Sequence, residues 1–230
     1  MSGVSGVIGM DKLDKPGVPD LSQLFIDVGS SSRENCPIAI GDPAIFDRPF
    51  IDLGNRLVSK AMDDRIGVAI LIEVIKKIKQ TPHEIHFVFS VQEEVGTRGA
   101  TTAAYEIDPE IGLSVDVTRT GDTPKSTKME VALDKGPAIK VRDSGMISDP
   151  RLVQCLVETA KANHIPYQLE VLEAGTTDAR AIQLTRSGVP SGCISIPCRY
   201  IHSPSEMVSY SDVEKIVDLL VKFLSAPIQI

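Results

Sequence analysis

The apolar positions of this chain follow a helical period in some segments and a strand period in others, and these segments alternate after residue 58. Apolar residues at helical spacing predict helices over residues 66–78, 97–105, 150–160 and 177–186. Dense or alternating apolar runs predict strands over residues 85–91, 111–117, 167–172 and 192–196. Strands that alternate with helices are typical of an α/β fold with a largely parallel sheet.

Two polar signals mark where helices begin. Asp149 followed by Pro150 predicts a helix start, because aspartate caps free backbone N–H groups and proline fits the first helical turn. Ser211 and Glu214 have the spacing of a capping box, and they predict a last amphipathic helix that ends at Leu224.

Residues 1–54 differ from the rest of the chain. They are rich in glycine, proline and serine, and they carry short β-type runs over residues 24–28 and 44–46 without any helical period. A segment of this size without a helix can hardly bury a core of its own. We therefore interpret it as part of a small β domain.

Composition and charge exclude several partners. The chain has 24 basic and 31 acidic residues and a net charge of −7, whereas nucleic acids and anionic membranes require a basic surface. No apolar run has the length of a membrane span, and no signal peptide opens the chain. The four cysteines form no C-x-x-C pair. We expect a reduced, cytoplasmic protein without nucleic-acid or membrane partners.

Several acidic residues and one histidine fall where strands are predicted to end or where the first long helix begins. They are Asp63, Asp64, Glu93, Glu94, Asp116 and His202. Ligands of open α/β sheets bind beyond the carboxyl ends of the strands, and a divalent metal would compensate carboxylates that lie beside apolar sequence. The alternative is ordinary ion pairing with neighbouring cations such as Lys60, Arg65 and Arg98. Pattern and spacing alone leave both possibilities open.

Six segments carry a specific resemblance. They are GDPAIFD (41–47), GNRLVSKAMDDRIG (54–67), SVQEEVGTRGA (90–100), SVDVT (114–118), GTTDA (175–179) and IPCRYIHSPSEM (196–207). In order and spacing they resemble the glutamyl/tetrahedral aminopeptidases, a family of two-metal exopeptidases with older labels such as cellulase or endoglucanase. The resemblance covers almost the whole chain. It implies a zinc-exopeptidase-like mixed, mostly parallel sheet with helices on both faces.

The resemblance also implies roles for the acidic residues. Asp63 bridges two metal ions, and its peptide bond to Asp64 is cis. Glu94 and His202 complete one metal position, and Asp116 binds the other. The expected cofactors are two divalent ions, zinc or cobalt.

Catalysis and substrate binding are assigned in the same way. Glu93 is implied as the general base that takes a proton from the metal-activated water. The expected activity is the release of N-terminal residues from short peptides. The residues that the resemblance places in the substrate pocket are Gly175, Thr176, Thr177, Asp178 and Arg199.

One family segment has no counterpart in this sequence. Family members open with a further segment that carries a His-x-Asp motif, and its histidine shares a metal with the residue that corresponds to Asp116. No histidine of this chain has aspartate at the second following position. We therefore expect residues 1–57 to be the end of an inserted β (dimerisation) domain. Residues 58–230 would be a catalytic domain, incomplete on its N-terminal side, that binds one metal well.

Three competing interpretations follow. The chain is an aminopeptidase, an inactive truncated remnant, or one half of a split enzyme that a complementing N-terminal polypeptide completes. The family also forms dimers and larger assemblies, so a homo-oligomer is a further expectation. An endoglucanase is the least favoured alternative, because the chain has no tryptophan and only 4% aromatic residues for stacking on sugars.

Overall fold

The computed structural model describes residues 3–13 and 17–230. The chain divides into two compact units, Met1–Phe46 and Asp47–Ile230. In the first unit β1 (Val7–Met10) pairs antiparallel with β2 (Leu24–Asp27), and the 3-10 helix η1 (Leu21–Gln23) directly precedes β2. Most apolar side chains of this hairpin are exposed, as expected for a small β segment without a core of its own.

The second unit is a seven-stranded mixed sheet covered by helices. Its strands are β3 (Ile51–Asp52), β4 (Arg56–Ser59), β5 (Gly112–Arg119), β6 (Ala138–Arg142), β7 (Gln168–Val171), β8 (Ser191–Arg199) and β9 (Glu206–Ser209). The order is β3-β4-β9-β8-β6-β7, and β5 pairs with the other edge of β8. The longest ladder, β5 with β8, is parallel, whereas β9, β4, β3 and β6 join through shorter antiparallel pairings. The mixed α/β fold that the sequence predicts is confirmed.

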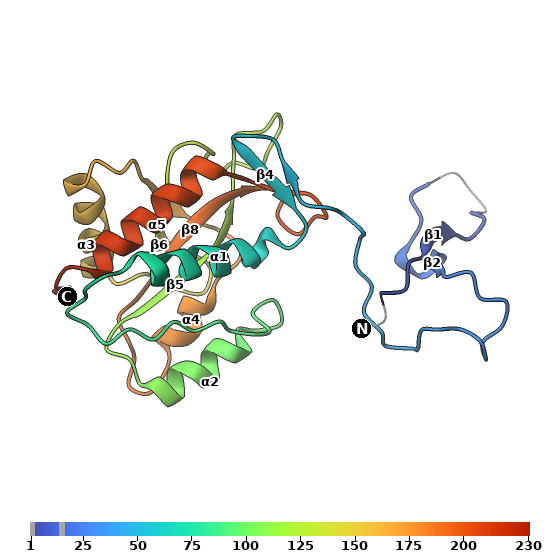
Figure 1. Ribbon diagram of the computed structural model, residues 1–230, viewed down its shortest axis with the longest axis horizontal. Coiled ribbons are helices and arrows are strands. Elements are labelled where there is room, and N and C mark those ends of the chain that lie inside the picture. Colours follow the sequence, from blue (N-terminus) through green and yellow to red (C-terminus); the bar gives the residue numbers. More distant parts are fainter. Residues whose placement is uncertain (1–2, 14–16) are drawn as a thin grey trace. The chain divides into compact units, whose positions relative to one another are not determined.

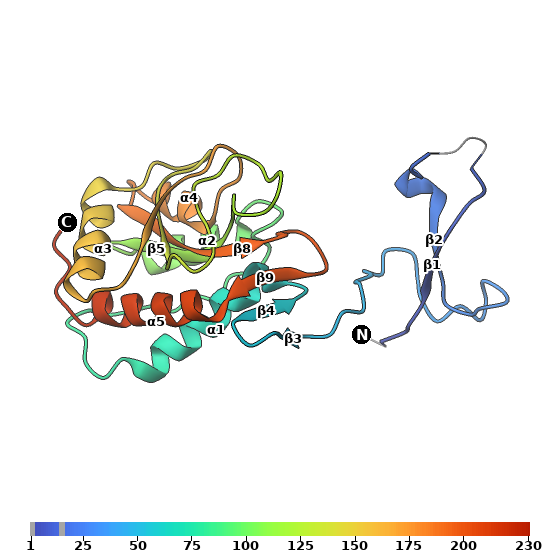
Figure 2. The same cartoon turned by 90° about the horizontal axis from the view of Figure 1, so that it is seen from above.

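Helices cover both faces of this sheet (Figures 1 and 2). They are α1 (Met62–Lys77), α2 (Arg98–Ile107), α3 (Pro150–Ala162), α4 (Asp178–Gln183) and α5 (Tyr210–Leu224). Helices α1, α3 and α5 pack on one face, and α4 packs on the other face with α2 against it. The main core lies beneath α1, α3 and α5, because their apolar stripes meet Ile194 and Ile196 of β8. No described helix is long and apolar enough to cross a membrane.

Strand alternation determines which residues of β5 reach the functional face. Odd-numbered residues such as Val115 and Val117 pack into the main core, whereas Ser114, Asp116 and Thr118 point to the face that carries α4. Gly112 lies on this second face, because a Cβ at this position would lie 2.3 Å from Ile182 of α4. Asp116 therefore stands on a strand that pairs with β8 along its whole length.

The structure corrects several sequence-based boundaries. Residues 85–91 are predicted as a strand, but the backbone of residues 84–90 makes no backbone hydrogen bond to any described residue, so no ladder forms. Residues 44–46 likewise form no strand. Helix α5 begins one residue before the predicted capping box, with Ser209 as its N-cap residue. The division between the two compact units falls after residue 46, because β3 and β4 join the large sheet through the pairing of β4 with β9, and the predicted domain boundary at 57/58 stays a prediction.

Candidate metal centre and active site

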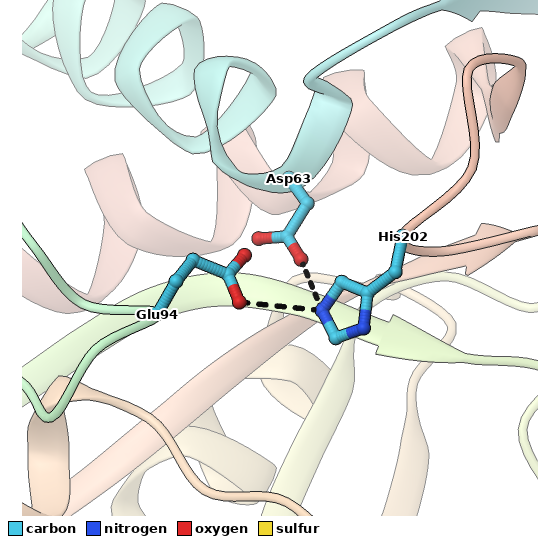
Figure 3. A group of neighbouring side chains, drawn as sticks. All are labelled: Asp63, Glu94 and His202. Carbon is cyan, nitrogen blue, oxygen red and sulfur yellow. Dashed lines mark ion pairs between the residues drawn. The ribbon is translucent and has the colours of Figure 1, made fainter. Parts of the chain in front are cut away.

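Three potential metal ligands converge from three separate segments (Figure 3). Asp63 lies at the start of α1, Glu94 in the loop before α2, and His202 in the loop between β8 and β9. His202 Nε2 lies 3.1 Å from Asp63 Oδ2 and 3.5 Å from Glu94 Oε2. The three ligand atoms lie within 4.8 Å of one another. One cation can therefore contact one atom of each side chain.

Unusual backbone geometry presents two of these ligands. The Asp63–Asp64 peptide bond is cis, as the resemblance implies, and Asp63 and Asp64 have non-helical φ and ψ angles inside α1. His202 has a positive φ of 62°, a conformation that is uncommon for residues other than glycine. The side chains of Asp63 and His202 both point into the cluster (Figure 3).

Glu206 fixes both segments, a role that the sequence did not predict. Its buried carboxylate accepts hydrogen bonds from the backbone N–H of Asp63, at 3.0 Å, and of His202, at 2.7 Å. Because one side chain accepts hydrogen bonds from both segments, Glu206 holds the two loops together. The available signal was a carboxylate at the start of the buried strand β9, four residues after His202.

Asp116 and Asp64 extend the cluster toward the sheet. Burial, and then the nearby charges of Asp63 and Glu93, raises the pKa of Asp116 well above its ordinary range. Burial, and then the charges of Asp116 and Asp63, raises the pKa of Asp64 to about 9. Gly67 makes room for Asp64, because a Cβ at this position would lie 2.2 Å from Asp64 Oδ2.

Glu93 and Asp178 are two further acidic residues near the cluster. Burial, followed by the charges of Asp178 and Glu94, raises the pKa of Glu93 to about 7. Asp178 accepts a short hydrogen bond from the Ser90 hydroxyl, while its buried Oδ1 has no hydrogen-bond partner within the described chain. Burial raises the pKa of Asp178 despite the bond from Ser90.

The charges of the cluster fit a divalent cation. Burial, followed by the neighbouring Glu94, raises the pKa of Asp63 to about 7, so several carboxylates here hold protons more tightly than usual. Buried carboxylates without a compensating positive charge are costly, and no Lys or Arg side chain forms an ion pair with Asp63, Glu94 or Asp116 within residues 3–13 and 17–230. Histidine nitrogen and carboxylate oxygen are ligands that zinc prefers. The donor set therefore suits zinc or a similar divalent ion.

A cavity of about 1040 Å³ opens onto this cluster. It is lined by all the predicted metal ligands and by Glu93, Gly175, Thr176 and Thr177. Asp178 and Arg199 lie outside the lining; the Arg199 guanidinium binds Asp122 through two hydrogen bonds of 2.9 and 3.0 Å. The metal, catalytic and substrate-binding roles of all these residues stay predictions.

A second buried ionic cluster lies beside the cavity and includes its own cation. Lys140 Nζ donates to Glu170 Oε1 at 2.9 Å and lies 3.9 Å from Asp143 Oδ2. All three side chains are fully buried. Burial lowers the pKa of Lys140, but the groups around it, which include Glu170 and Asp143, outweigh burial, so that the pKa is raised. The Cys193 thiol is neutral at pH 7, because burial raises its pKa to about 11, so the carboxylates keep Lys140 charged.

A mixed sheet that gathers histidine and carboxylates beside its strand ends is the arrangement shared by α/β metallopeptidases. Comparison with known proteins gives the family: the chain belongs to the M42 glutamyl aminopeptidases, which it matches over residues 2–219. This confirms the resemblance that the sequence motifs indicated, and with it the aminopeptidase class.

Individual relatives agree with this assignment. The chain is 50% identical over 224 residues to a relative from Acetivibrio thermocellus that carries an aminopeptidase name; the match covers 95% of this chain and 68% of the relative. It is 36% identical over 226 residues to the lysyl aminopeptidase of Pyrococcus furiosus, with 93% and 64% covered. The chain thus spans about two thirds of the length of these relatives.

Solved structures show the same fold. An aminopeptidase from the archaeon Desulfurococcus kamchatkensis matches with a TM-score of 0.91 and 44% identity, over 96% of this chain and 64% of that one. The endoglucanase label occurs as the name of a Thermotoga maritima structure that matches with a TM-score of 0.78, 32% identity and coverage of 97% and 65%. The same label stands beside peptidase in the name of one further structure, whereas other similar structures are named aminopeptidases or peptidases.

Proposed function

We propose that this chain carries the active centre of a metal-dependent aminopeptidase that releases N-terminal residues from short peptides. The observation that carries this proposal is the convergence of Asp63, Glu94 and His202 beside Asp116 in a chain of the M42 family. Three protein ligands are the usual number for a catalytic zinc ion. Asp63, Glu94 and His202 would hold one zinc or cobalt ion, and Asp63 and Asp116 would contribute to a second.

The protein residues around the metal ion would have separate roles. A bound divalent ion would supply Lewis-acid activation of water and of the scissile carbonyl group. Glu93 lies at the cavity beside the ligands, and its raised pKa of about 7 suits a general base at neutral pH. Glu206 holds the backbones of Asp63 and His202 in place. The acidic lining would also attract the free amino group of a peptide.

A complementing segment would complete the second metal position. Asp63 and Asp116 offer two ligands there, and about a third of the length of each relative lies outside the matched region. The run 85–90 supports docking of a further strand, because its backbone makes no backbone hydrogen bond within the described chain. Val88, Phe89 and Val91 are 40%, 46% and 68% exposed there. The segment would come from a longer form of this chain or from another polypeptide.

Self-association is a further part of the proposal. The apolar hairpin of the first unit exposes Val7, Ile8 and Met10, which are side chains that proteins usually bury in an interface. The TET1 peptidase of Pyrococcus horikoshii, which matches this chain with a TM-score of 0.79, can assemble into a tetrahedron or an octahedral shell. We propose a homo-oligomer in the cytoplasm, where the four free cysteines would stay reduced.

Hydrolysis of a short unblocked peptide tests the activity directly. The purified chain is supplied with zinc or cobalt and compared on the same peptide with a free and with an acetylated N-terminus. Turnover of the unblocked peptide alone supports an aminopeptidase. Equal turnover of both peptides, or activity on cellulose that survives a chelator, contradicts the proposal.

Complementation tests the split-enzyme interpretation. The part of the Acetivibrio thermocellus relative that lies outside the match is produced together with the chain, and peptide turnover is measured with and without it. Turnover that requires the added segment supports a complemented active site. A folded, metal-loaded complex without turnover would favour the inactive remnant instead.

A further inference from the structure

One wall of the cavity is a loop over residues 172–177, which we call the cavity loop and which leads into α4. Its residues Gly175, Thr176 and Thr177 line the cavity. The cavity loop belongs to no helix or strand. A segment without regular structure keeps one shape only where other parts of the chain bind it. The partners of the cavity loop therefore decide how well this wall is fixed.

A turn over residues 143–146, directly after β6, binds the cavity loop. The backbone N–H of Ser144 donates to the carbonyl oxygen of Gly175 at 3.2 Å, and the Ser144 hydroxyl donates to the same oxygen at 2.7 Å. The Thr176 hydroxyl donates to Asp143 Oδ1 at 3.2 Å. Two neighbouring residues of the turn thus hold two neighbouring residues of the cavity wall.

Asp143 also fixes the shape of the turn itself. Its Oδ1 accepts hydrogen bonds from the backbone N–H groups of Gly145 and Met146, both at 2.8 Å. An aspartate that binds the backbone two and three residues further on holds a turn in one conformation. Its side chain is fully buried and its Oδ2 lies 3.9 Å from Lys140 Nζ. The turn is therefore anchored in the buried ionic cluster before it meets the cavity loop.

Gly145 allows the turn and the cavity loop to approach each other closely. A Cβ at this position would lie 2.7 Å from Thr176 Oγ1 and 2.6 Å from Arg180 Cδ, so a larger residue would push Thr176 away from Asp143. Residues 143–146 themselves do not line the cavity. The turn can therefore affect a molecule in the cavity only through the cavity loop.

We propose that Asp143, Ser144 and Gly145 are positioning residues for the peptide substrate. They hold the cavity loop in the conformation that a bound peptide contacts, and they do not touch the peptide. A wall that already has this conformation saves the cost of ordering it when the peptide binds, and so it strengthens binding. This inference rests on the proposed aminopeptidase function and adds to it residues outside the cavity that govern substrate affinity.

Two variants of the turn and one matched control test the proposal. Ser144→Ala removes the hydroxyl bond to Gly175, and Gly145→Ala forces the turn and the cavity loop apart. The control is Ser148→Ala, because the buried Ser148 hydroxyl donates to the carbonyl oxygen of Lys140 at 2.6 Å and not to the cavity loop. We would measure kcat and KM for Leu-Ala-Ala-amide on the metal-loaded protein, with the complementing segment present if turnover requires it.

Both variants should raise KM and leave kcat unchanged, because they weaken binding and not the chemical step. Ser144→Ala should raise KM about 3- to 10-fold, the usual effect of one hydrogen bond. Gly145→Ala should raise it about 10- to 100-fold, because it moves part of the cavity wall. Ser148→Ala should keep the native KM. A merely structural role would lower the fraction of folded protein, which reduces the apparent kcat and leaves KM as it is.

Two results would overturn the positioning role. One is a native KM in Ser144→Ala and Gly145→Ala, and if Gly145→Ala does not fold, Ser144→Ala decides alone. The other is an equal rise of KM in Ser148→Ala.

A second measurement separates this inference from the proposed function. If the native protein does not hydrolyse the peptide, the proposed function fails, and hydrogen exchange of the amide of residue 144, which donates to Gly175, replaces KM. That amide should exchange about 3- to 10-fold faster in Ser144→Ala and Gly145→Ala than in the native protein or Ser148→Ala, because the bonds that hold the turn to the cavity loop are weakened. Unchanged exchange in both variants would refute the contact that the proposal requires.

Discussion

Two groups of buried carboxylates lie close together in this fold and are balanced in different ways. In the first, Glu170 and Asp143 surround Lys140, a cation that the chain itself supplies. In the second, Asp63, Asp64 and Asp116 form no ion pair with any Lys or Arg within residues 3–13 and 17–230, and His202 contacts only Asp63 among them. The pKa of each is raised by burial and by its acidic neighbours. The second group therefore lacks the compensating Lys or Arg charge that the first group has. A divalent ion would have the role there that Lys140 has in the first.

The largest expected effect concerns Glu93, which faces the cluster and is not assigned as a ligand. Glu93→Gln should reduce peptide turnover by about 10²- to 10⁴-fold, the usual contribution of a general base, while the protein keeps its metal. Turnover and metal content are measured on the same sample, with Glu158→Gln, on the surface of α3, as the control. Loss of the metal together with the activity would show that Glu93 is a ligand.

The second prediction removes the internal cation from the first group. Lys140→Met leaves Glu170 and Asp143 buried without a positive charge, and it should lower the free energy of unfolding by about 3–5 kcal/mol. Denaturant unfolding measures this change, with the exposed Lys135→Met as its control. A free energy of unfolding within about 1 kcal/mol of that control would show that Lys140 does not compensate the buried carboxylates of the first group.

The third prediction uses pH on the metal-free chain. The folded-state pKa values of Asp63 and Glu93 are raised to about 7 from ordinary values near 4. Between about pH 4 and pH 7 the native state therefore binds more protons than the unfolded state. Stability is therefore fully present below pH 4 for these groups and is lost as the pH rises through about 7, by about 1.4 kcal/mol per pH unit for one carboxyl group.

Thermal unfolding between pH 5 and pH 8 tests this sign. The unfolding temperature of the metal-free chain should fall as the pH rises. Added zinc should raise the unfolding temperature most at pH 8, where protons compete least with zinc for the carboxylates. A metal-free chain that becomes more stable toward pH 8 would contradict the pKa shifts.

The smallest effect concerns Arg199, which the sequence placed in the substrate pocket. Burial raises the pKa of Asp122, but hydrogen bonds from Arg199 and Thr120 outweigh it and lower the pKa to about 2. The stabilisation is present above pH 4 and lost as the pH falls through about 2. Arg199→Gln should cost about 1 kcal/mol at pH 7 with no change in KM. A raised KM at unchanged stability would return Arg199 to the substrate pocket.

Local signals predicted much of the fold. The Asp149–Pro150 pair located the start of α3, and Asp149 accepts a hydrogen bond from the backbone N–H of Arg151 as an N-cap residue should. The prediction of a strand over residues 85–91 was wrong for a different reason. Its apolar pattern is real, but a strand requires a neighbour to bond with, and pattern alone does not reveal whether a neighbour is present.

The pattern of acidic residues and a histidine left metal binding and ion pairing both open, and the family resemblance implied Asp63, Glu94, Asp116 and His202 as ligands. The structure brings Asp63, Glu94 and His202 together, and their roles stay predictions. Glu206 was missed, because its role is to accept two backbone hydrogen bonds that exist only once the loops meet. Spacing along the chain carries no information on such tertiary partners.

The most direct test of the central claim is a zinc titration of the purified chain at pH 7.5, followed calorimetrically. The native chain should bind at least one zinc ion, Asp63→Ala should bind none because the predicted positions share that carboxylate, and the surface variant Asp218→Ala should bind as the native chain does. Zinc retained in full by a folded Asp63→Ala would contradict the bridging role. A native chain that binds no zinc would contradict the metal centre itself.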